Sequence, residues 1–302
     1  MTYRNAPFAI LAALLLCVST ASAAQDDAER MNALLGAADK ATASGNHETA
    51  AEYLGQLFNM ELRPVERFEV LLMRGNAYKA AGNTELAAQD WRAALDTGEA
   101  TLAQQHAILN ATAALWVKAD ERERVEEIID NWPLEQPPSE APVYYLAKTS
   151  TIEHEFGNAL DYTRPLVNYS NSPNHMEYLR LMLFLLTAEG RDGEIENLIS
   201  RFEEQCTEIL SVSDADASPA VRIAVQYPYQ AAKWGREGAC DMTFDVNRRG
   251  ETENIRADCT KEIFERTSIK TVEKWLYLPK IVDGNTEPRY GIQTRLTYQL
   301  EN

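Results

Sequence analysis

The pattern of apolar and polar positions is helical through the first two hundred residues and mixed in the last eighty. Two stretches rich in Pro, Asn and Ser, LEQPPSEAP (Leu134–Pro142) and NYSNSPN (Asn168–Asn174), interrupt the helical part and predict loops. The stretch SVSDADASPA at 211–220 is small, polar and poor in helix formers, so we expect a linker there. The pattern therefore predicts two domains, at 26–210 and 221–302.

The helical part repeats itself. The stretch Arg74–Leu95 (RGNAYKAAGNTELAAQDWRAAL) has small and large residues at the spacing of a tetratricopeptide-like helix pair, namely Gly75, Tyr78, Gly82, Ala87, Trp91 and Ala94. A similar stretch, Ala43–Phe58, lies 37 residues earlier, and weaker copies centred on Val125, Ala159 and Ile195 follow at spacings of 38, 34 and 36 residues. A single helix pair cannot bury its apolar side alone, so stacking about five pairs predicts an all-α solenoid over 26–210. Such solenoids offer a concave face to a partner peptide, and a rigid spacer without a ligand is the alternative.

The last eighty residues predict a helix, a hairpin, a second helix and a final strand. YPYQAAKWG (Tyr227–Gly235) is typical of a short helix that begins near a proline. Two-residue alternation through Cys240–Val246 predicts a half-buried strand, and NRRG (Asn247–Gly250) predicts the turn after it. KEIFERTSIKTVEKW (Lys261–Trp275) carries one apolar helical stripe. In the closing strand, Ile292, Thr294, Leu296, Tyr298 and Leu300 alternate with Gln293, Arg295, Thr297 and Gln299.

Two cysteines mark the open end of the expected hairpin. If Phe244 pairs with Ile255 across the hairpin, Cys240 comes to lie directly opposite Cys259. Antiparallel partners have Cα atoms about 4.5–5.5 Å apart, within the range that a disulfide accepts. We therefore expect a Cys240–Cys259 disulfide that clamps the hairpin, and two buried free thiols are the alternative. Cys206 remains as an odd thiol.

The order helix, hairpin, helix, strand resembles the C-terminal domain of the TonB family of periplasmic energy transducers. The resemblance covers about 75 residues and rests on a set of motifs: Gln226-Tyr227-Pro228, Glu237-Gly238, Phe244-Asp245-Val246, Gly250, Phe264, Val272, Trp275-x-Tyr277-x-Pro279, Gly284 and the final strand. It implies an α+β chain, in which the solenoid is followed by a two-layer α/β domain with a three-stranded antiparallel sheet.

The resemblance also implies a partner. In the family, the C-terminal domain binds an extended segment of an outer-membrane transporter by adding it to a sheet edge. Here the expected edge is the last strand, because it alternates and contains no internal proline. The candidate partner-binding residues are Tyr290, Gly291, Ile292, Gln293, Thr294, Arg295, Leu296 and Thr297. A homodimer that uses this edge for self-pairing is an alternative.

The N-terminus predicts export. One basic residue, Arg4, precedes an apolar run from Pro7 to Val18, and Ala21-Ser22-Ala23 provides a small-residue cleavage site. We expect a signal peptide at 1–23 and a periplasmic location. An uncleaved segment would anchor the protein in the inner membrane facing the periplasm, as an energy transducer requires, and is the alternative.

The charge is negative and unevenly distributed. The formal net charge is −17; residues 24–220 carry −19, while residues 221–302 carry +1. A nucleic-acid partner is therefore not expected, because phosphate binding needs positive charge.

We find no motif for catalysis, a cofactor or a metal, and the four histidines are scattered through the repeats: His47, His106, His154 and His175. Acids flank Cys206, which makes a reactive thiolate unfavourable. The sequence thus predicts a non-enzymatic periplasmic adaptor in support of transmembrane transport. Its repeats would be a second protein-docking surface, and a structural envelope scaffold without transport coupling is the alternative.

Overall fold

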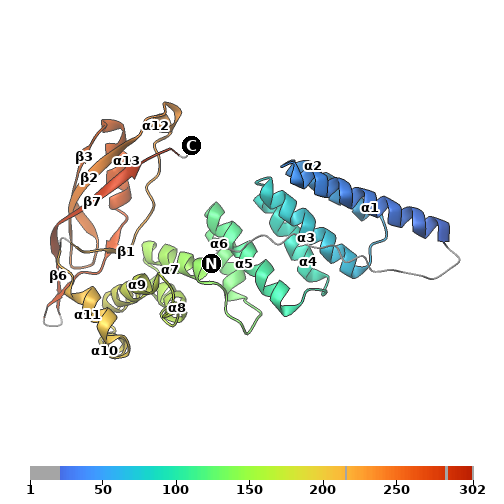
Figure 1. Ribbon diagram of the computed structural model, residues 1–302. Helices are drawn as coiled ribbons and strands as arrows, with labels where there is room; N and C mark the ends of the chain where they lie inside the picture. Colours follow the sequence, from blue (N-terminus) through green and yellow to red (C-terminus); the bar gives the residue numbers. More distant parts are fainter. Residues whose placement is uncertain (1–20, 215, 283–284, 301–302) are drawn as a thin grey trace. The chain divides into compact units, whose positions relative to one another are not determined.

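The computed structural model describes residues 21–300 except 215 and 283–284 (Figure 1). Residues 1–20 of the expected signal peptide lie outside the described residues. Contacts divide the chain into two compact units, Met1–Leu115 and Trp116–Asn302. Within the described parts of the chain, no helix is both long enough and apolar enough to cross a membrane.

The first unit consists of paired helices. Its elements are α1 (Ala21–Ala43), α2 (His47–Gln56), the 3₁₀ turn η1 (Leu57–Asn59), α3 (Pro64–Ala80), α4 (Thr84–Asp96) and most of α5 (Leu102–Ala119). Helices α3 and α4 cross closely at Gly75, where a Cβ atom would lie 2.6 Å from the Trp91 ring. Beside this crossing, Arg74 donates two hydrogen bonds of 2.7 Å to the Asp90 carboxylate. The absence of a side chain at Gly75 therefore lets the two helices approach closely, as the small residues of the repeat pattern predict.

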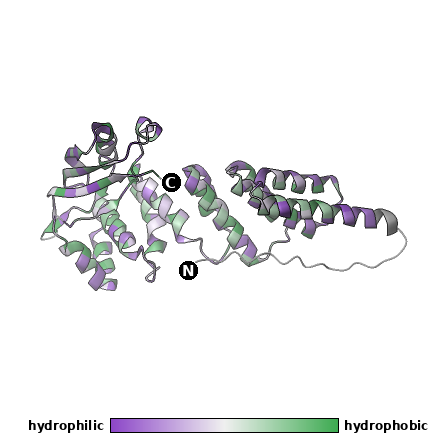
Figure 2. Ribbon diagram, turned by 45° about the horizontal axis from the view of Figure 1, so that its top comes forward, coloured by the Kyte–Doolittle hydropathy of each residue, from purple (hydrophilic) through white to green (hydrophobic). Residues whose placement is uncertain are grey.

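The second unit begins with more paired helices, α6 (Arg122–Asp130), α7 (Glu140–Ile152), α8 (Phe156–Leu166), α9 (His175–Ala188) and α10 (Asp192–Arg201), followed by α11 (Glu203–Ser211). Most of these helices carry both hydrophobic and hydrophilic residues along one ribbon (Figure 2). Helix α9 is apolar on all sides because its LMLFLL run, residues 181–186, lies in the middle of the unit's core. Each of these six side chains is 5% exposed or less.

Five helix pairs end their first helix in the same way. A residue one or two positions after the helix has a left-handed backbone in each pair, at Gly45, Gly82, Asp120, His154 and Gly190. In each case the next amide donates to the carbonyl five residues earlier, as Asn83 does to Tyr78 at 2.8 Å and Glu155 to Ser150 at 2.8 Å. This is the hydrogen bond of a Schellman cap, which favours glycine. The five turns lie 37, 38, 34 and 36 residues apart, so the weak sequence copies are confirmed as helix pairs.

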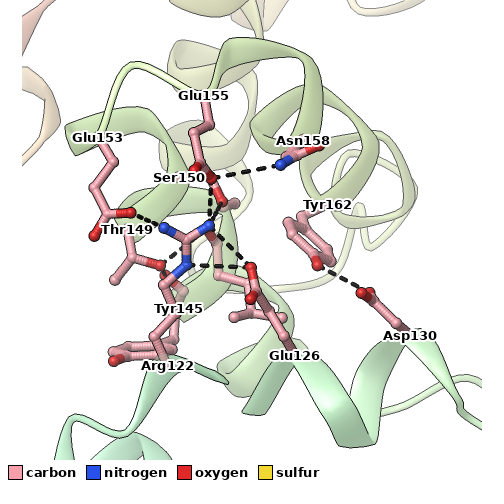
Figure 3. Close-up of polar contacts among 12 residues, drawn as sticks. Arg122, Glu126, Asp130, Tyr145, Thr149, Ser150, Glu153, Glu155, Asn158 and Tyr162 are labelled. Carbon is pink, nitrogen blue, oxygen red and sulfur yellow. Dashed lines mark hydrogen bonds and ion pairs between the residues drawn. The ribbon is translucent and has the colours of Figure 1, made fainter. Parts of the chain in front are cut away.

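One arginine fastens the α7–α8 turn to α6 (Figure 3). Arg122, at the start of α6, donates to Glu126 of the same helix at 2.9 Å and to the Ser150 hydroxyl at 3.1 Å. It also pairs with Glu153 and Glu155, which flank the turn. Burial lowers the pKa of Arg122, but the hydrogen bonds to Glu155 and Glu126 outweigh it and raise that pKa overall. The Arg122 guanidinium therefore stays charged and holds α6 to the α7–α8 pair.

The C-terminal domain is a three-stranded antiparallel sheet with helices on one face. Its elements are β1 (Pro219–Val221), α12 (Tyr229–Lys233), β2 (Gly238–Val246), β3 (Thr252–Cys259), η2 (Glu262–Phe264), α13 (Glu265–Val272), β4 (Leu276–Tyr277), β5 (Lys280–Val282), β6 (Asn285–Glu287) and β7 (Arg289–Tyr298). The sheet order is β3-β2-β7, and β1–β4 and β5–β6 form two small pairs. Helix α13 packs against β3 and β2 (Figure 1). The predicted α+β fold class, with its three-stranded antiparallel sheet, is confirmed.

The hairpin register differs from the prediction at one point. Thr243 pairs with Arg256 as expected, but Asp245 pairs with Glu253, so the expected Phe244–Ile255 pair falls at a shift in the ladder. Asn254 has a left-handed backbone there, with φ +53°, and its side chain donates to Asp245 at 2.9 Å. Asparagine tolerates this conformation better than most residues, so it accommodates the bulge.

The helices and the sheet domain of the second unit share a core. Ala220, Val221, Leu276 and Leu278 belong to the same buried cluster as α9. The end of the expected linker at 211–220 therefore lies inside the protein, because Pro219 and Ala220 are part of β1 and Ala220 is 3% exposed. The small residues of this stretch suggested a linker, but Ala220 instead packs closely into the core.

Candidate partner-binding edge of the C-terminal sheet

Strand β7 lies at an edge of the sheet. It pairs with β2 along its length, with Leu296 opposite Cys240, Thr294 opposite Met242 and Ile292 opposite Phe244. Because the sheet order is β3-β2-β7, no strand among the described residues pairs with the other side of β7. An edge strand presents unpaired N–H and C=O groups to any chain that can align with it.

The backbone groups that face outward can be assigned from the ladder. The Ala239 carbonyl accepts a 2.9 Å bond from the Thr260 amide on the β3 side. Successive residues of a strand point their backbone groups to opposite sides, so Cys240, Met242 and Phe244 face β7. Their partners in β7 therefore bond to β2. It follows that the backbone N–H and C=O groups of the intervening residues face the open edge, and these residues are Gln293, Arg295 and Thr297.

The buried side chains on the inner face of β7 hold the strand in place. Ile292, Leu296 and Tyr298 are each 3% exposed or less. The Tyr298 ring stacks on Phe264 at 4.2 Å between centroids, and its hydroxyl shares a 2.8 Å hydrogen bond with Ser268 of α13. The side chains of Gln293, Arg295 and Thr297 are exposed on the other face, as the alternation predicted. The strand is thus rigidly held while its outer edge stays open.

The start of β7 departs from a regular strand. Gly291 has φ +67°, and the ladder with β2 shifts where Arg289 pairs with Val246. The Gly291 amide donates to the Asp245 carboxylate at 2.8 Å, and Tyr290 is 64% exposed. Of the eight expected partner-binding residues, Tyr290 and Gly291 therefore belong to a bulge, and the regular edge begins at Ile292. Only glycine adopts this backbone conformation at low cost, which was the available sequence signal.

A buried arginine anchors this bulge. Arg289 is 3% exposed and donates to the Leu278 carbonyl at 3.0 Å and to the Val212 carbonyl at 3.1 Å. It also pairs with Asp214 at 3.1 Å. The start of β7 is thereby tied to the chain that follows α11. Sequence reasoning missed this role because a lone arginine at a strand end has no distinguishing pattern.

A groove of about 500 Å³ runs along the open edge. Its lining comes from β7, from Trp275 between α13 and β4, and from the segment after β1: Arg222, Ile223, Ala224, Val225, Arg295, Leu296 and Thr297 complete the set. The Trp275 indole donates a 3.0 Å hydrogen bond to the Ile223 carbonyl, and the Arg222 guanidinium lies 4.8 Å from the Trp275 ring centre. Of these residues the sequence predicted only the three in β7, because the segment after β1 adjoins them only in the folded chain.

The expected disulfide is present. Cys240 and Cys259 are bonded, and they lie opposite each other in the β2–β3 ladder. Cys206 is a free, buried thiol, and burial raises its pKa. Within the described ranges, no group of three or more His, Cys, Asp or Glu side chains could hold a metal ion.

The C-terminal part is thus a small α+β domain with one open sheet edge and a groove beside that edge. Residues 223–300 match the family model of the Gram-negative bacterial TonB protein C-terminal region. The C-terminal domain is therefore a TonB C-terminal domain, which confirms the resemblance seen in the sequence. The match covers about a quarter of the chain. No curated protein matched the sequence.

Several solved structures resemble the helical part. A crystal structure of MamA aligns at a TM-score of 0.38 with 13% identity, covering 61% of this chain and 98% of that one. MamA from Desulfovibrio magneticus RS-1 aligns at 0.35 with 14% identity, covering 59% and 94%. A putative kinesin light chain from Podosopora anserina, with nearly identical TPR-like repeats, aligns at 0.34 with 16% identity, covering 61% and 98%.

Proposed function

We propose that this protein is a periplasmic adaptor that binds an outer-membrane transporter, or another envelope protein, by strand addition to β7. The observation that carries the proposal is the open edge at Gln293, Arg295 and Thr297 in a domain of the TonB type. Backbone hydrogen bonds along such an edge supply affinity, and pockets for alternate side chains supply selectivity. In this role the protein supports transmembrane transport.

The helical repeats provide a second docking surface in this proposal. They form five helix pairs with the same turn geometry, as in repeat domains that bind other proteins, and their segment of the chain carries most of the negative charge. The protein would then connect two partners without chemistry of its own, as an adaptor and not an enzyme. It would need no cofactor.

The proposal is tested by proline substitution at the open edge. Proline at Gln293 and Thr297 removes two outward N–H donors and leaves the hydrogen bonds from β7 to β2 in place. The full chain is used to capture partners from detergent-solubilised outer membranes, which are then identified by mass spectrometry. We expect a transporter to be recovered with the wild-type chain and lost with the double proline variant.

The matched control is the double variant Gln293→Ala and Thr297→Ala, which alters the same side chains and keeps both amides. It should recover the transporter as the wild type does. Equal recovery by the proline variant would contradict strand addition and favour the scaffold alternative.

N-terminal sequencing of the exported protein separates the adaptor from a membrane-anchored energy transducer, since an intact Met1 would support the anchored form.

A further inference from the structure

The segment between β1 and α12 is an extended chain that pairs with no strand among the described residues. Arg222, Ala224 and Gln226 are exposed, while Ile223, Val225 and Tyr227 are partly buried against the core of the sheet. This two-residue alternation is that of a half-buried strand. Within the described part of the chain, residues 223–227 belong to no sheet and make no backbone–backbone hydrogen bond.

This segment and β7 form the two sides of one groove. Arg222–Val225 of the segment and Arg295–Thr297 of β7 both line it, together with Trp275. Figure 1 shows the segment passing beside β7 on its way from β1 to α12. The Trp275 hydrogen bond to the Ile223 carbonyl holds the segment in place. Unpaired extended backbone therefore borders the groove on both sides.

The lining of the groove also specifies which side chains fit. Ile223, Val225 and Leu296 pack with the core of the sheet, so the groove is apolar on its inner side. Arg222 and Arg295 are exposed at its rims. Arg222 has no carboxylate partner among the described residues, and the Arg295–Asp241 pair, at 2.8 Å, is more than 60% exposed on both sides. Such an exposed pair is weak and can be shared with a ligand.

We propose that the partner segment inserts between β7 and residues 223–227 and forms a strand with hydrogen bonds on both sides. Because side chains alternate along a strand, the inserted segment carries apolar residues toward Trp275 and acidic residues toward Arg222 and Arg295. The inference rests on the proposed function and refines it. Addition to the β7 edge alone would use every second amide of the ligand, whereas insertion uses consecutive amides.

The probe is the synthetic peptide acetyl-Glu-Val-Glu-Val-Glu-Val-Glu-amide, titrated into the full chain by calorimetry. Two further peptides carry one N-methyl group, either on the central Val amide or on the Glu amide beside it. In an inserted strand these amides donate to opposite sides. Losing one hydrogen bond should lower the affinity about three- to tenfold, so we expect both N-methyl peptides to bind more weakly.

An affinity loss with only one of the two N-methyl peptides would overturn insertion and leave addition to a single edge. Hydrogen exchange of the protein gives an independent readout. With the unmodified peptide bound, amides in 223–227 and in 293–297 should both be protected. Protection confined to 293–297 would likewise overturn insertion.

The charge requirement is tested with Arg222→Gln, which should lower the affinity for the acidic peptide about threefold or more. Arg266→Gln is the matched control, because Arg266 is exposed on α13 and does not line the groove. A peptide with lysine in place of each glutamate should not bind. Equal binding of both peptides, or of neither, would overturn the acidic–apolar ligand. Neither result would affect the transporter-capture experiment, which tests strand addition separately.

Discussion

The Trp275 indole nitrogen lies 3.0 Å from the Ile223 carbonyl oxygen, 52 residues away in sequence. This hydrogen bond joins the connection between α13 and β4 to the extended segment that borders the groove. The ring itself is 1% exposed and belongs to the core of the sheet domain. One buried side chain thus supports the core and holds the side of the groove opposite β7.

Replacing Trp275 with phenylalanine should separate these two roles. The variant Trp275→Phe loses the indole donor, and a single hydrogen bond contributes about 1 kcal/mol net. A smaller ring also leaves a cavity, so we expect a loss of about 2 kcal/mol in the free energy of unfolding, measured with denaturant. Amides of residues 223–227 should exchange faster in the variant. Unchanged exchange in that segment would show that the hydrogen bond does not hold it.

The Cys240–Cys259 disulfide should stabilise the C-terminal domain by about 3 kcal/mol, because it closes a loop with a sequence separation of 19. We expect the double variant Cys240→Ala and Cys259→Ala to unfold at correspondingly lower denaturant concentration. Adding reductant to the wild type should have a similar effect, and it should leave the double variant unchanged. The same reductant effect in the double variant would show that the reductant does not act through this disulfide.

Gly250 should tolerate no side chain. It has φ +83°, and a Cβ atom would overlap the Tyr277 carbonyl and the Phe184 ring. Gly250→Ala should therefore lower the free energy of unfolding by more than about 2 kcal/mol, from backbone strain and overpacking together. Gly235 is the matched control: it has φ +60° with nothing within 4 Å, so Gly235→Ala should cost only about 1 kcal/mol. Equal losses would show that packing against Phe184 is unimportant.

The repeat turns should respond alike to loss of glycine. Gly45, Gly82 and Gly190 have positive φ and open space around their Cβ positions. Alanine at any one of them should destabilise the helical region by about 1 kcal/mol, as followed by circular dichroism during thermal unfolding. Gly36 lies inside α1 with open space and no positive φ, so Gly36→Ala should stabilise it by up to about 1 kcal/mol. A loss at Gly36 would contradict this explanation.

Stability should depend on pH through Glu251 in the β2–β3 turn. A hydrogen bond from the Asn247 side chain, at 2.9 Å, holds the pKa of Glu251 below its usual value, and Arg249 at 3.1 Å adds to the effect. A carboxylate whose pKa is lowered on folding stabilises the protein above its unfolded pKa and loses that contribution as pH falls through its folded pKa. Glu251→Gln should therefore be less stable than wild type at pH 7. That difference should shrink by pH 3, and a constant difference would contradict the expectation.

Much of the fold could be predicted because its patterns are local. Helical repeats, two-residue alternation and the cysteines opposite each other in the hairpin all follow from short-range spacing, and the structure has them where expected. The left-handed turn residues Asp120 and His154 were harder to recognise, since neither is glycine. Their turns became recognisable only from the spacing of the stronger copies.

The candidate site could be predicted only in part. The alternation of β7 indicated which side chains face out, and this assignment holds from Ile292 onward. The bulge at Gly291 depends on a tertiary hydrogen bond to Asp245, and the opposite side of the groove comes from Arg222–Val225, about seventy residues earlier. Contacts between such distant segments arise from packing and leave no periodic signal in the sequence.

Helix α9 and the sheet domain meet through one shared core. Ala220 and Val221 are buried in it, and Arg289 fastens the beginning of β7 to the chain after α11. A tensile load on β7 would therefore pass directly into the helices of the second unit. A partner that pulls on this strand would therefore act on α9 through the shared packing, and not on the sheet alone.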